Sequence, residues 1–218
     1  NFNLGNICII NDCSNEDTTN YLNNFAKENT QFQVLHNEEN LGFVKTCNRG
    51  MKLATGDIVV LLNSDTKIPK EFCERIIKCF ESDEKIGIAS PISSYTSTYF
   101  IPLPQNYNIE KMNKLLREKH KCEYPIIPAA EGFCFCIKKD VIKQQGYLDE
   151  VYGKGYHEEV DYAYRSITNG WNNVLIDNLY VYHKRQASFG AEMRKELIEV
   201  LSKYVELDKE ALELNFEQ

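Results

Sequence analysis

The chain has 218 residues and a formal net charge of -7, so it is long enough for one large α/β domain with a sizeable core. An acidic chain without a dense run of Lys and Arg is unsuited to nucleic acid as its main partner. No apolar stretch approaches the length of a membrane-spanning helix, and the first residues carry no signal-peptide pattern. Diphosphate ligands remain open, because a metal ion and helix N-termini can neutralise them.

The first half of the chain alternates between apolar runs and amphipathic segments. We expect strands at 6–10, 33–36, 58–62 and 86–90, and helices at 17–29, 43–53 and 69–82. Such alternation is typical of a parallel, doubly wound sheet with helices on both faces.

The pattern changes after Pro91. Residues 93–108 are rich in Ser, Thr, Tyr, Pro and Asn and are expected to form a long loop. Beyond it we expect helices at 109–120, 140–146 and 158–169, strands at 128–138 and 173–182, and an acidic amphipathic helix or helix pair at 193–212.

The eight cysteines do not form a metal-binding pattern. They contain no C-x-x-C pair and no cluster at the short spacing that zinc sites need. Several lie in apolar runs, where a free thiol behaves as a small hydrophobe. We therefore expect reduced thiols in a cytosolic protein and no disulfide scaffold.

The segment Asn63-Ser64-Asp65 follows the apolar run at 58–62 directly. A carboxylate at the carboxyl end of a buried strand lies where open α/β sheets bind ligands, and a cation that holds a diphosphate needs such a group. The alternative is an ordinary turn, because Asn, Ser and Asp are common turn formers.

Three other segments accompany Asp65 in a fixed order. Their sequences are NDCS at 11–14, GYHEEVDYAYR at 155–165 and VYHKRQASF at 181–189. In order and spacing, the chain resembles the inverting family-two glycosyltransferases, in the subgroup of bacterial rhamnosyl- and related sugar transferases, from about residue 7 to 189. The resemblance implies a GT-A fold, which is a Rossmann-like, mostly parallel sheet flanked by helices. It would form a catalytic domain at 1–190, followed by a helical extension at 191–218.

The resemblance also implies a nucleotide site and a metal site. The residues expected at the nucleotide are Asp12 at the base, Asn40 and Gly42 beside it, Asn63 near the ribose or sugar, and Asp65. Asp65 and His183 are the expected ligands of a divalent cation, Mn²⁺ or Mg²⁺. Simpler explanations exist for several of them: an Asx-turn for Asp12, backbone geometry for the glycine, and an ordinary polar residue for His183.

Glu159 stands where the family has its catalytic base. Because Glu replaces the usual Asp, Glu158 is the alternative. Solvated carboxylates at a helix start, favoured by the helix dipole, would explain the same pattern without catalysis. The residues expected to bind acceptor hydroxyls are Asp149, Glu150 and Asp161. Asp149 or Glu150 could instead cap a turn, and Asp161 could pair with Arg165 one turn later.

The activity implied by the resemblance is transfer of a sugar from a nucleoside-diphosphate sugar to an acceptor hydroxyl. The acceptor would be a glycan, a lipid-linked molecule or a protein, in the synthesis of a cell-surface polysaccharide or glycoconjugate. The protein would be cytoplasmic, free or peripherally attached to a membrane. The alternatives are a catalytically impaired nucleotide-sugar-binding or scaffold domain, and a nucleotidyl transferase, which usually has a Gly-rich basic phosphate loop near its first strand.

The start of the chain departs from the family pattern. Family members have an apolar strand and a helix upstream of the strand at 7–10, and only six residues precede it here. A central strand cannot be deleted without leaving its neighbours' backbone groups unpaired. We therefore expect a fragment whose nucleotide pocket is open on the base side.

Overall fold

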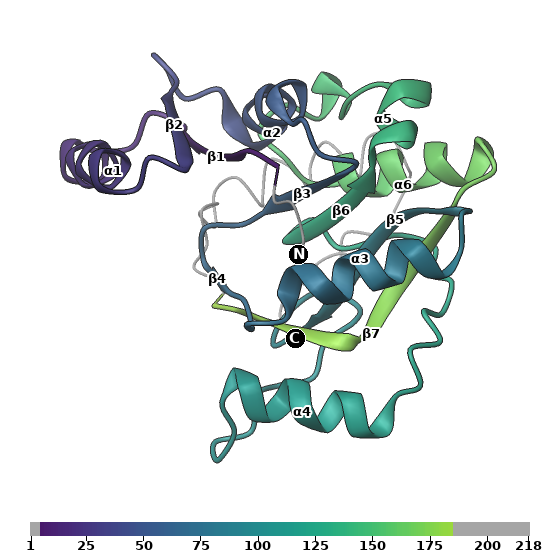
Figure 1. The fold of residues 1–218 in the computed structure, drawn as a ribbon. Coiled ribbons are helices and arrows are strands. Elements are labelled where there is room, and N and C mark those ends of the chain that lie inside the picture. Colours follow the sequence, from purple (N-terminus) through teal and green to yellow (C-terminus); the bar gives the residue numbers. More distant parts are fainter. Residues whose placement is uncertain (1–4, 185–218) are drawn as a thin grey trace, which may run out of the picture. The chain divides into compact units, whose positions relative to one another are not determined.

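The computed structural model describes residues 5–184, which form two sheets flanked by helices (Figure 1). The elements are β1 (Ile7–Asn11), α1 (Glu16–Glu28), β2 (Phe32–His36), α2 (Gly42–Leu53), β3 (Ile58–Leu62), β4 (Thr66–Lys67), α3 (Phe72–Ser82), β5 (Ile86–Ser93), α4 (Ile109–Lys119), β6 (Cys134–Lys138), α5 (Lys139–Gln145), the 3-10 helix η1 (Glu150–Tyr152), α6 (Glu158–Thr168) and β7 (Asn172–His183).

The larger sheet has the strand order β3-β6-β5-β7-β4. β5 and β7 are parallel, whereas β6 runs antiparallel to both of its neighbours and β4 runs antiparallel to β7. The α/β architecture expected from the sequence is confirmed, but this sheet is mixed and not wholly parallel. The reason is the long connection between β5 and β6, which returns the chain to the sheet in the opposite direction.

β1 and β2 form a separate parallel pair. Helix α2 contacts both β1 and β3. Within residues 5–184, no strand pairs with the second edge of β1 or with the second edge of β3. The two sheets therefore meet under α2 without a continuous hydrogen-bonded ladder.

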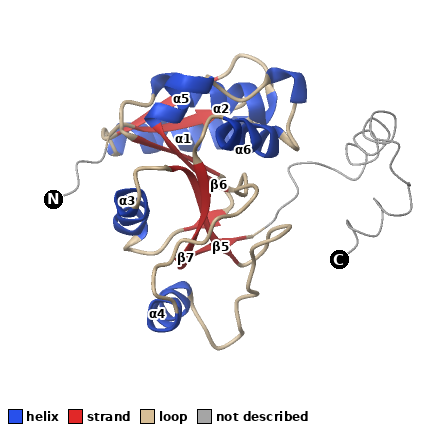
Figure 2. Ribbon diagram, turned by 90° about the vertical axis from the view of Figure 1, so that its right-hand side faces the viewer, coloured by secondary structure: helices blue, strands red, loops and turns tan. Residues whose placement is uncertain are grey.

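The core follows the pleat of β6, whose alternate side chains enter two different clusters. Cys134 and Cys136 pack with α3 on one face, and Phe135 and Ile137 pack with α2, α5 and α6 on the other. Figure 2 shows α3 and α6 on opposite sides of the sheet. A strand that is buried on both faces needs apolar residues at every position, as the sequence CFCI provides.

Two buried asparagines fasten helices to distant segments. In α2, the amide of Asn48 donates to the Leu148 carbonyl at 2.9 Å and accepts from the Leu148 N–H at 3.0 Å. In α4, Asn113 bonds the backbone of Tyr180 in the same way, at 2.9 and 2.8 Å. Each side chain satisfies one donor and one acceptor that would otherwise be buried without partners.

Most expected elements are present, with shifted boundaries. The strand expected at 128–138 is shorter and begins at Cys134, and the helix expected from Pro69 begins at Phe72 after a turn in which Phe72 N–H bonds the Pro69 carbonyl. The helices expected at 193–212 lie outside the described residues. Within the described part, all eight cysteines are free, and no helix has the length and apolarity to span a bilayer.

Replacing Asn113 with Ala is expected to lower the free energy of unfolding by about 2–4 kcal/mol, because two buried backbone groups of Tyr180 lose their partner. Urea denaturation monitored by circular dichroism measures this change. Asn106→Ala, at an exposed position before the same helix, is the control and should change stability by less than about 0.5 kcal/mol. Equal losses in the two variants would contradict the role given to Asn113.

Candidate active site

Asp65 and His183 meet at one edge of the larger sheet. β4 pairs with the end of β7 so that Thr66 lies opposite His183, and the Lys184 N–H donates to the Asp65 carbonyl at 3.0 Å. Figure 1 shows β4 beside the end of β7. The His183 Nε2 atom lies 3.2 Å from the Asp65 Oδ1 atom. The structure thus brings together the two residues expected to share a metal ion.

The turn that carries Asp65 is fixed by its own hydrogen bonds. The Asn63 N–H donates to the Phe133 carbonyl at 2.9 Å, and the Asn63 carbonyl accepts from the Thr66 hydroxyl at 2.7 Å. The alternative of a simple strand exit is therefore correct as local structure. It also places Asp65 against His183.

Glu158 and Glu159 begin helix α6, after a strained segment of backbone. Gly155, Tyr156 and His157 all have positive φ angles, of 136°, 76° and 69°. Non-glycine residues rarely adopt this region, and such strain is concentrated at functional sites. Glu158 is only 4% exposed, and the buried Oε2 atoms of both glutamates have no hydrogen-bond partner among residues 5–184. The alternative of a solvated helix start is therefore wrong for these two side chains.

Burial is the main cause of the unusual proton affinity of this pair. It raises the pKa of Glu159 to about 8, and the Glu158 and Glu131 carboxyls act in the same direction. Burial also raises the pKa of Glu158 above its ordinary value. The two carboxyls therefore compete for protons, and the charge of Glu158 favours the protonated form of Glu159.

Residues 131–133 connect the acidic pair with the Asp65–His183 pair. A Cβ atom on Gly132 would lie 3.7 Å from the Glu159 carboxyl carbon, and Gly132 and Glu159 line the same narrow hollow together with Phe43, Leu61, Phe135, Leu148 and Glu158. The adjacent Phe133 ring stacks on the His183 ring at 5.1 Å between centroids. Gly132 thus borders the acidic pair, and the next residue, Phe133, contacts His183.

Sequence reasoning missed Glu131, Phe133 and Ser94, and it placed Tyr95 only in a segment expected to border the acceptor site. Glu131 accepts hydrogen bonds from the Ser97 hydroxyl at 3.1 Å and the Thr98 N–H at 3.0 Å. The sequence EGFC at 131–134, a glycine between an acid and an apolar strand, was the available signal. The loop residues Ser94 and Tyr95 act partly through backbone groups, which residue type does not reveal.

Asp12 fixes the loop that precedes α2. Its carboxylate accepts hydrogen bonds from the Leu41 N–H at 2.8 Å, the Gly42 N–H at 2.9 Å and the Asn37 amide at 2.8 Å. Burial alone would raise the pKa of Asp12, but these hydrogen bonds outweigh it and hold the pKa below its ordinary value. Asp12 therefore lies at the start of α2, where its charge favours the helix dipole.

Gly42 is required by its surroundings. Its φ angle is +77°, and a Cβ atom there would lie 2.8 Å from the Lys154 Cα atom. Both the positive φ angle and the close approach of Lys154 exclude a side chain at this position. Asn40 is exposed, and its amide reaches the Asp12 carbonyl at 3.4 Å. The nucleotide contacts expected of Asp12, Asn40 and Gly42 stay predictions, and the structure gives these residues a shared loop.

Two of the three residues expected at the acceptor, Asp149 and Asp161, have local side-chain partners. Asp149 caps the 3-10 helix η1 by accepting from the Val151 N–H at 3.0 Å, while Glu150 is exposed. Asp161 pairs with Arg165 at 2.9 Å, as its spacing indicated. The Arg165 guanidinium also donates to the Gln145 and Tyr147 carbonyls, so this pair fastens α6 to the segment after α5.

The donor set of Asp65 and His183 fits a divalent cation. A carboxylate oxygen and an imidazole nitrogen at 3.2 Å can occupy neighbouring positions around one ion. Tyr95 supplies the backbone carbonyl that metal-bound histidines commonly use on their second nitrogen, 3.0 Å from Nδ1. Within residues 5–184, no three His, Cys, Asp or Glu side chains form a complete site, so the ligand and water would supply the remaining positions.

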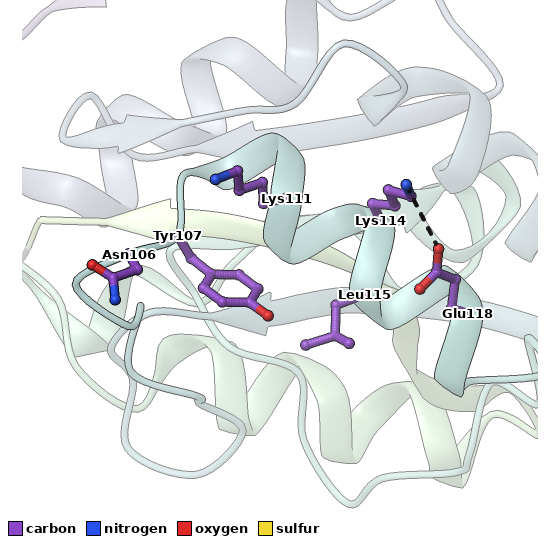
Figure 3. A pocket seen from close by; sticks show the side chains of 6 residues that line it. All are labelled: Asn106, Tyr107, Lys111, Lys114, Leu115 and Glu118. Carbon is purple, nitrogen blue, oxygen red and sulfur yellow. Dashed lines mark ion pairs between the residues drawn. The ribbon is translucent and has the colours of Figure 1, made fainter.

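A second hollow lies on α4 (Figure 3). It is an open surface groove lined by Asn106, Tyr107, Lys111, Lys114, Leu115 and Glu118, with Lys114 and Glu118 3.9 Å apart. None of the residues of the two acidic and metal-ligating pairs lines it. The groove is therefore separate from the candidate active site.

The family follows from comparison with known sequences. The sequence model described as "Glycosyl transferase family 2" matches residues 3–146, about two thirds of the chain. The chain belongs to glycosyl transferase family 2. Glycosyltransferase GlyG of Streptococcus pneumoniae is 21% identical over 216 residues, covering 91% of this chain and 69% of GlyG. The poly-beta-1,6-N-acetyl-D-glucosamine synthase of Staphylococcus aureus is 35% identical over 81 residues, which are 37% of this chain and 19% of the synthase.

Solved structures place this family member in the GT-A fold. The mannosyltransferase PcManGT from Pyrobaculum calidifontis, in complex with GDP-Man and Mn²⁺, has a TM-score of 0.63 at 15% identity. The match covers 93% of this chain and 55% of the mannosyltransferase. The chain thus spans only part of several of the glycosyltransferases that it matches.

Glu159→Gln is expected to stabilise the protein above neutral pH. A raised pKa means that the stability associated with protonated Glu159 is full below its ordinary pKa of 4.5 and is lost as pH rises to about 8. Gln stays neutral throughout, so the variant should melt at a higher temperature at pH 8.5, by about 2–4 °C per kcal/mol gained. The difference should shrink towards pH 5, as calorimetry can measure.

The control for this pH dependence is Glu150→Gln, which changes an exposed carboxylate near the same helix. Its melting temperature should follow that of the wild-type protein at every pH. If Glu159→Gln gave no pH-dependent gain, the burial described for this carboxyl would be wrong.

Proposed function

We propose that this chain is the catalytic part of a metal-dependent, inverting glycosyltransferase that uses a nucleoside-diphosphate sugar. The observation that carries the proposal is the junction at Gly132 and Phe133. On one side it borders a buried carboxyl with a raised pKa, and on the other it contacts the imidazole of a carboxylate–histidine pair. A base and a cation site at adjacent positions suit a reaction that removes a proton and releases a diphosphate.

Glu159 would be the general base. Its carboxylate would take the proton from the acceptor hydroxyl while that oxygen forms a bond to the anomeric carbon of the sugar. The bond from that carbon to the diphosphate oxygen breaks with its electron pair, and attack from the opposite face inverts the configuration. A base with a pKa near the working pH combines a useful ionised fraction with a strong affinity for the proton.

Asp65 and His183 would hold a divalent cation on the diphosphate side. When bound there, the cation supplies positive charge that stabilises the departing diphosphate. The chain itself orients the two ligands. Tyr95 and Phe133 orient His183, and the Asn63–Thr66 turn orients Asp65. The Mn²⁺ in the structure of PcManGT with GDP-Man supports this use of a cation.

The donor nucleotide would lie near the loop held by Asp12, with Asn40 and Asn63 as further contacts. The acceptor would approach Glu159, close to Asp149, Glu150 and Asp161, and would be a glycan, a lipid-linked molecule or a protein. The local similarity to the synthase of poly-beta-1,6-N-acetyl-D-glucosamine supports a place in polysaccharide synthesis.

The rate is expected to rise with pH through the pKa of Glu159. Because the base must be ionised, kcat/KM for sugar transfer or for hydrolysis of a UDP- or GDP-sugar should increase towards a plateau above about pH 8. Glu159→Gln should lower turnover by about 10²–10⁴-fold while nucleotide affinity changes little.

Glu158→Gln separates the two acids. Removing the Glu158 charge should lower the pKa of Glu159, so the rising limb should move to lower pH while turnover persists. If Glu158→Gln abolished turnover and Glu159→Gln did not, the base would be Glu158.

Asp65→Ala is expected to abolish Mn²⁺-dependent binding of a nucleoside diphosphate. Thermal shift with UDP and with GDP, each with and without Mn²⁺, measures this loss, because a bound ligand stabilises the native state by mass action. Asp149→Ala, in the cap of η1, is the control and should keep the Mn²⁺-dependent shift. Binding without any sugar transfer or hydrolysis in the wild-type protein would favour the impaired nucleotide-sugar-binding domain.

A further inference from the structure

The backbone of His183 is held by the side chain of Ser94. The Ser94 hydroxyl donates to the His183 carbonyl at 2.9 Å and accepts from the His183 N–H at 2.8 Å. These two bonds satisfy both backbone groups of one residue through a single hydroxyl. Ser94 is only 9% exposed, so water has little access to replace it.

The residue after Ser94 holds the ring of the same histidine. The Tyr95 carbonyl lies 3.0 Å from His183 Nδ1, and because a carbonyl only accepts, Nδ1 carries the proton. Nε2 is then the nitrogen directed at Asp65, 3.2 Å away. The Phe133 ring stacks on the imidazole with an angle of 17° between the planes. The backbone, tautomer and ring plane of His183 are therefore each fixed by a different contact.

The loop that carries Ser94 and Tyr95 is itself anchored at both ends. The Ser93 carbonyl accepts from the Ile101 N–H at 2.8 Å, and the Ser93 hydroxyl bonds the Tyr95 backbone at 3.1 Å. Farther along, Glu131 holds Ser97 and Thr98. A loop fixed in this way can transmit a defined position to His183.

We propose that Ser94 is a positioning residue for the cation site, acting through His183. Its hydroxyl sets the backbone of His183 so that Nε2 remains directed at Asp65 and can take part in binding a divalent cation. This inference rests on the proposed function, because it concerns the cation that Asp65 and His183 would share. It assigns a role in the metal site to a side chain that would not itself contact the metal.

The test measures the dissociation constant of Mn²⁺ by electron paramagnetic resonance of the free ion, with UDP present and with GDP in a parallel series. Ser94→Ala is expected to raise this constant by about 10–100-fold, the usual effect of removing a group that orients a metal ligand. The matched control is Ser82→Ala, which removes a hydroxyl that bonds the Cys79 carbonyl at 2.7 Å at the end of α3. It should leave Mn²⁺ affinity unchanged.

A double-mutant cycle separates positioning from a general loss of structure. If Ser94 acts through His183, then Ser94→Ala should have little further effect on Mn²⁺ affinity in a His183→Ala background. A loss of the same size in both backgrounds would overturn the proposal. Melting temperatures without metal show whether the Ser94 and Ser82 variants are folded to the same degree.

The controls also distinguish this inference from the proposed function. If the wild-type protein binds Mn²⁺, Asp65→Ala loses it and Ser94→Ala binds it with unchanged affinity, only the role of Ser94 is overturned. Failure of the wild-type protein to bind Mn²⁺ with either nucleotide would overturn both the cation site and the role of Ser94.

Discussion

The short antiparallel contact between β4 and the end of β7 determines the geometry of the candidate site. It sets Thr66 opposite His183 and bonds Lys184 to the Asp65 carbonyl, joining segments that are far apart in sequence. Backbone hydrogen bonds give this contact a fixed register, and a shift by one residue would turn His183 to the other face of the sheet. The placement of the carboxylate beside the imidazole therefore depends on a ladder of only two residue pairs.

The acidic half of the site depends on a different constraint, the exclusion of water. Glu158 and Glu159 line one hollow with residues of α2 and β6, and the nearby Glu131 carboxyl acts on Glu159 as a further negative group. In water these groups would ionise independently, whereas burial makes them compete for protons. The arrangement gives one carboxyl a greater affinity for protons. Such an affinity suits a general base, but it lowers the stability of the protein at high pH, where the buried carboxyl must ionise.

The fold class and the order of most elements could be predicted from the sequence, whereas the two pairs at the site came from the family resemblance and their roles stay predictions. Asp65 lies three residues after the apolar run of β3 and His183 ends the run of β7, so the sequence pattern could predict that both lie at strand ends. The sequence could not predict that β6 runs antiparallel to its neighbours. A long polar connection precedes this strand, and the spacing of apolar residues does not depend on the direction of a strand. The role of Ser94 was also hidden, since it consists of bonds to the backbone of a residue in another strand.

Asp12 illustrates the remaining limit of prediction. Its position after β1 indicated a ligand contact, and the structure shows a carboxylate that accepts three hydrogen bonds from the loop before α2. Side-chain bonds to nearby backbone compete with ligand contacts for the same oxygen atoms, and the position of a residue in a strand does not decide between them. Only the conformation of residues 37–42 reveals which bonds are made.

The three successive positive φ angles before α6 have a consequence for native-state motion. Backbone of this kind costs about 1–3 kcal/mol for each non-glycine residue, here Tyr156 and His157. That energy is released when the segment opens, so the first turn of α6 should separate from the site at a smaller free energy than the sheet. In native-state hydrogen exchange, the amides of this turn would exchange through local opening, whereas those of β5 and β6 would exchange only through global unfolding.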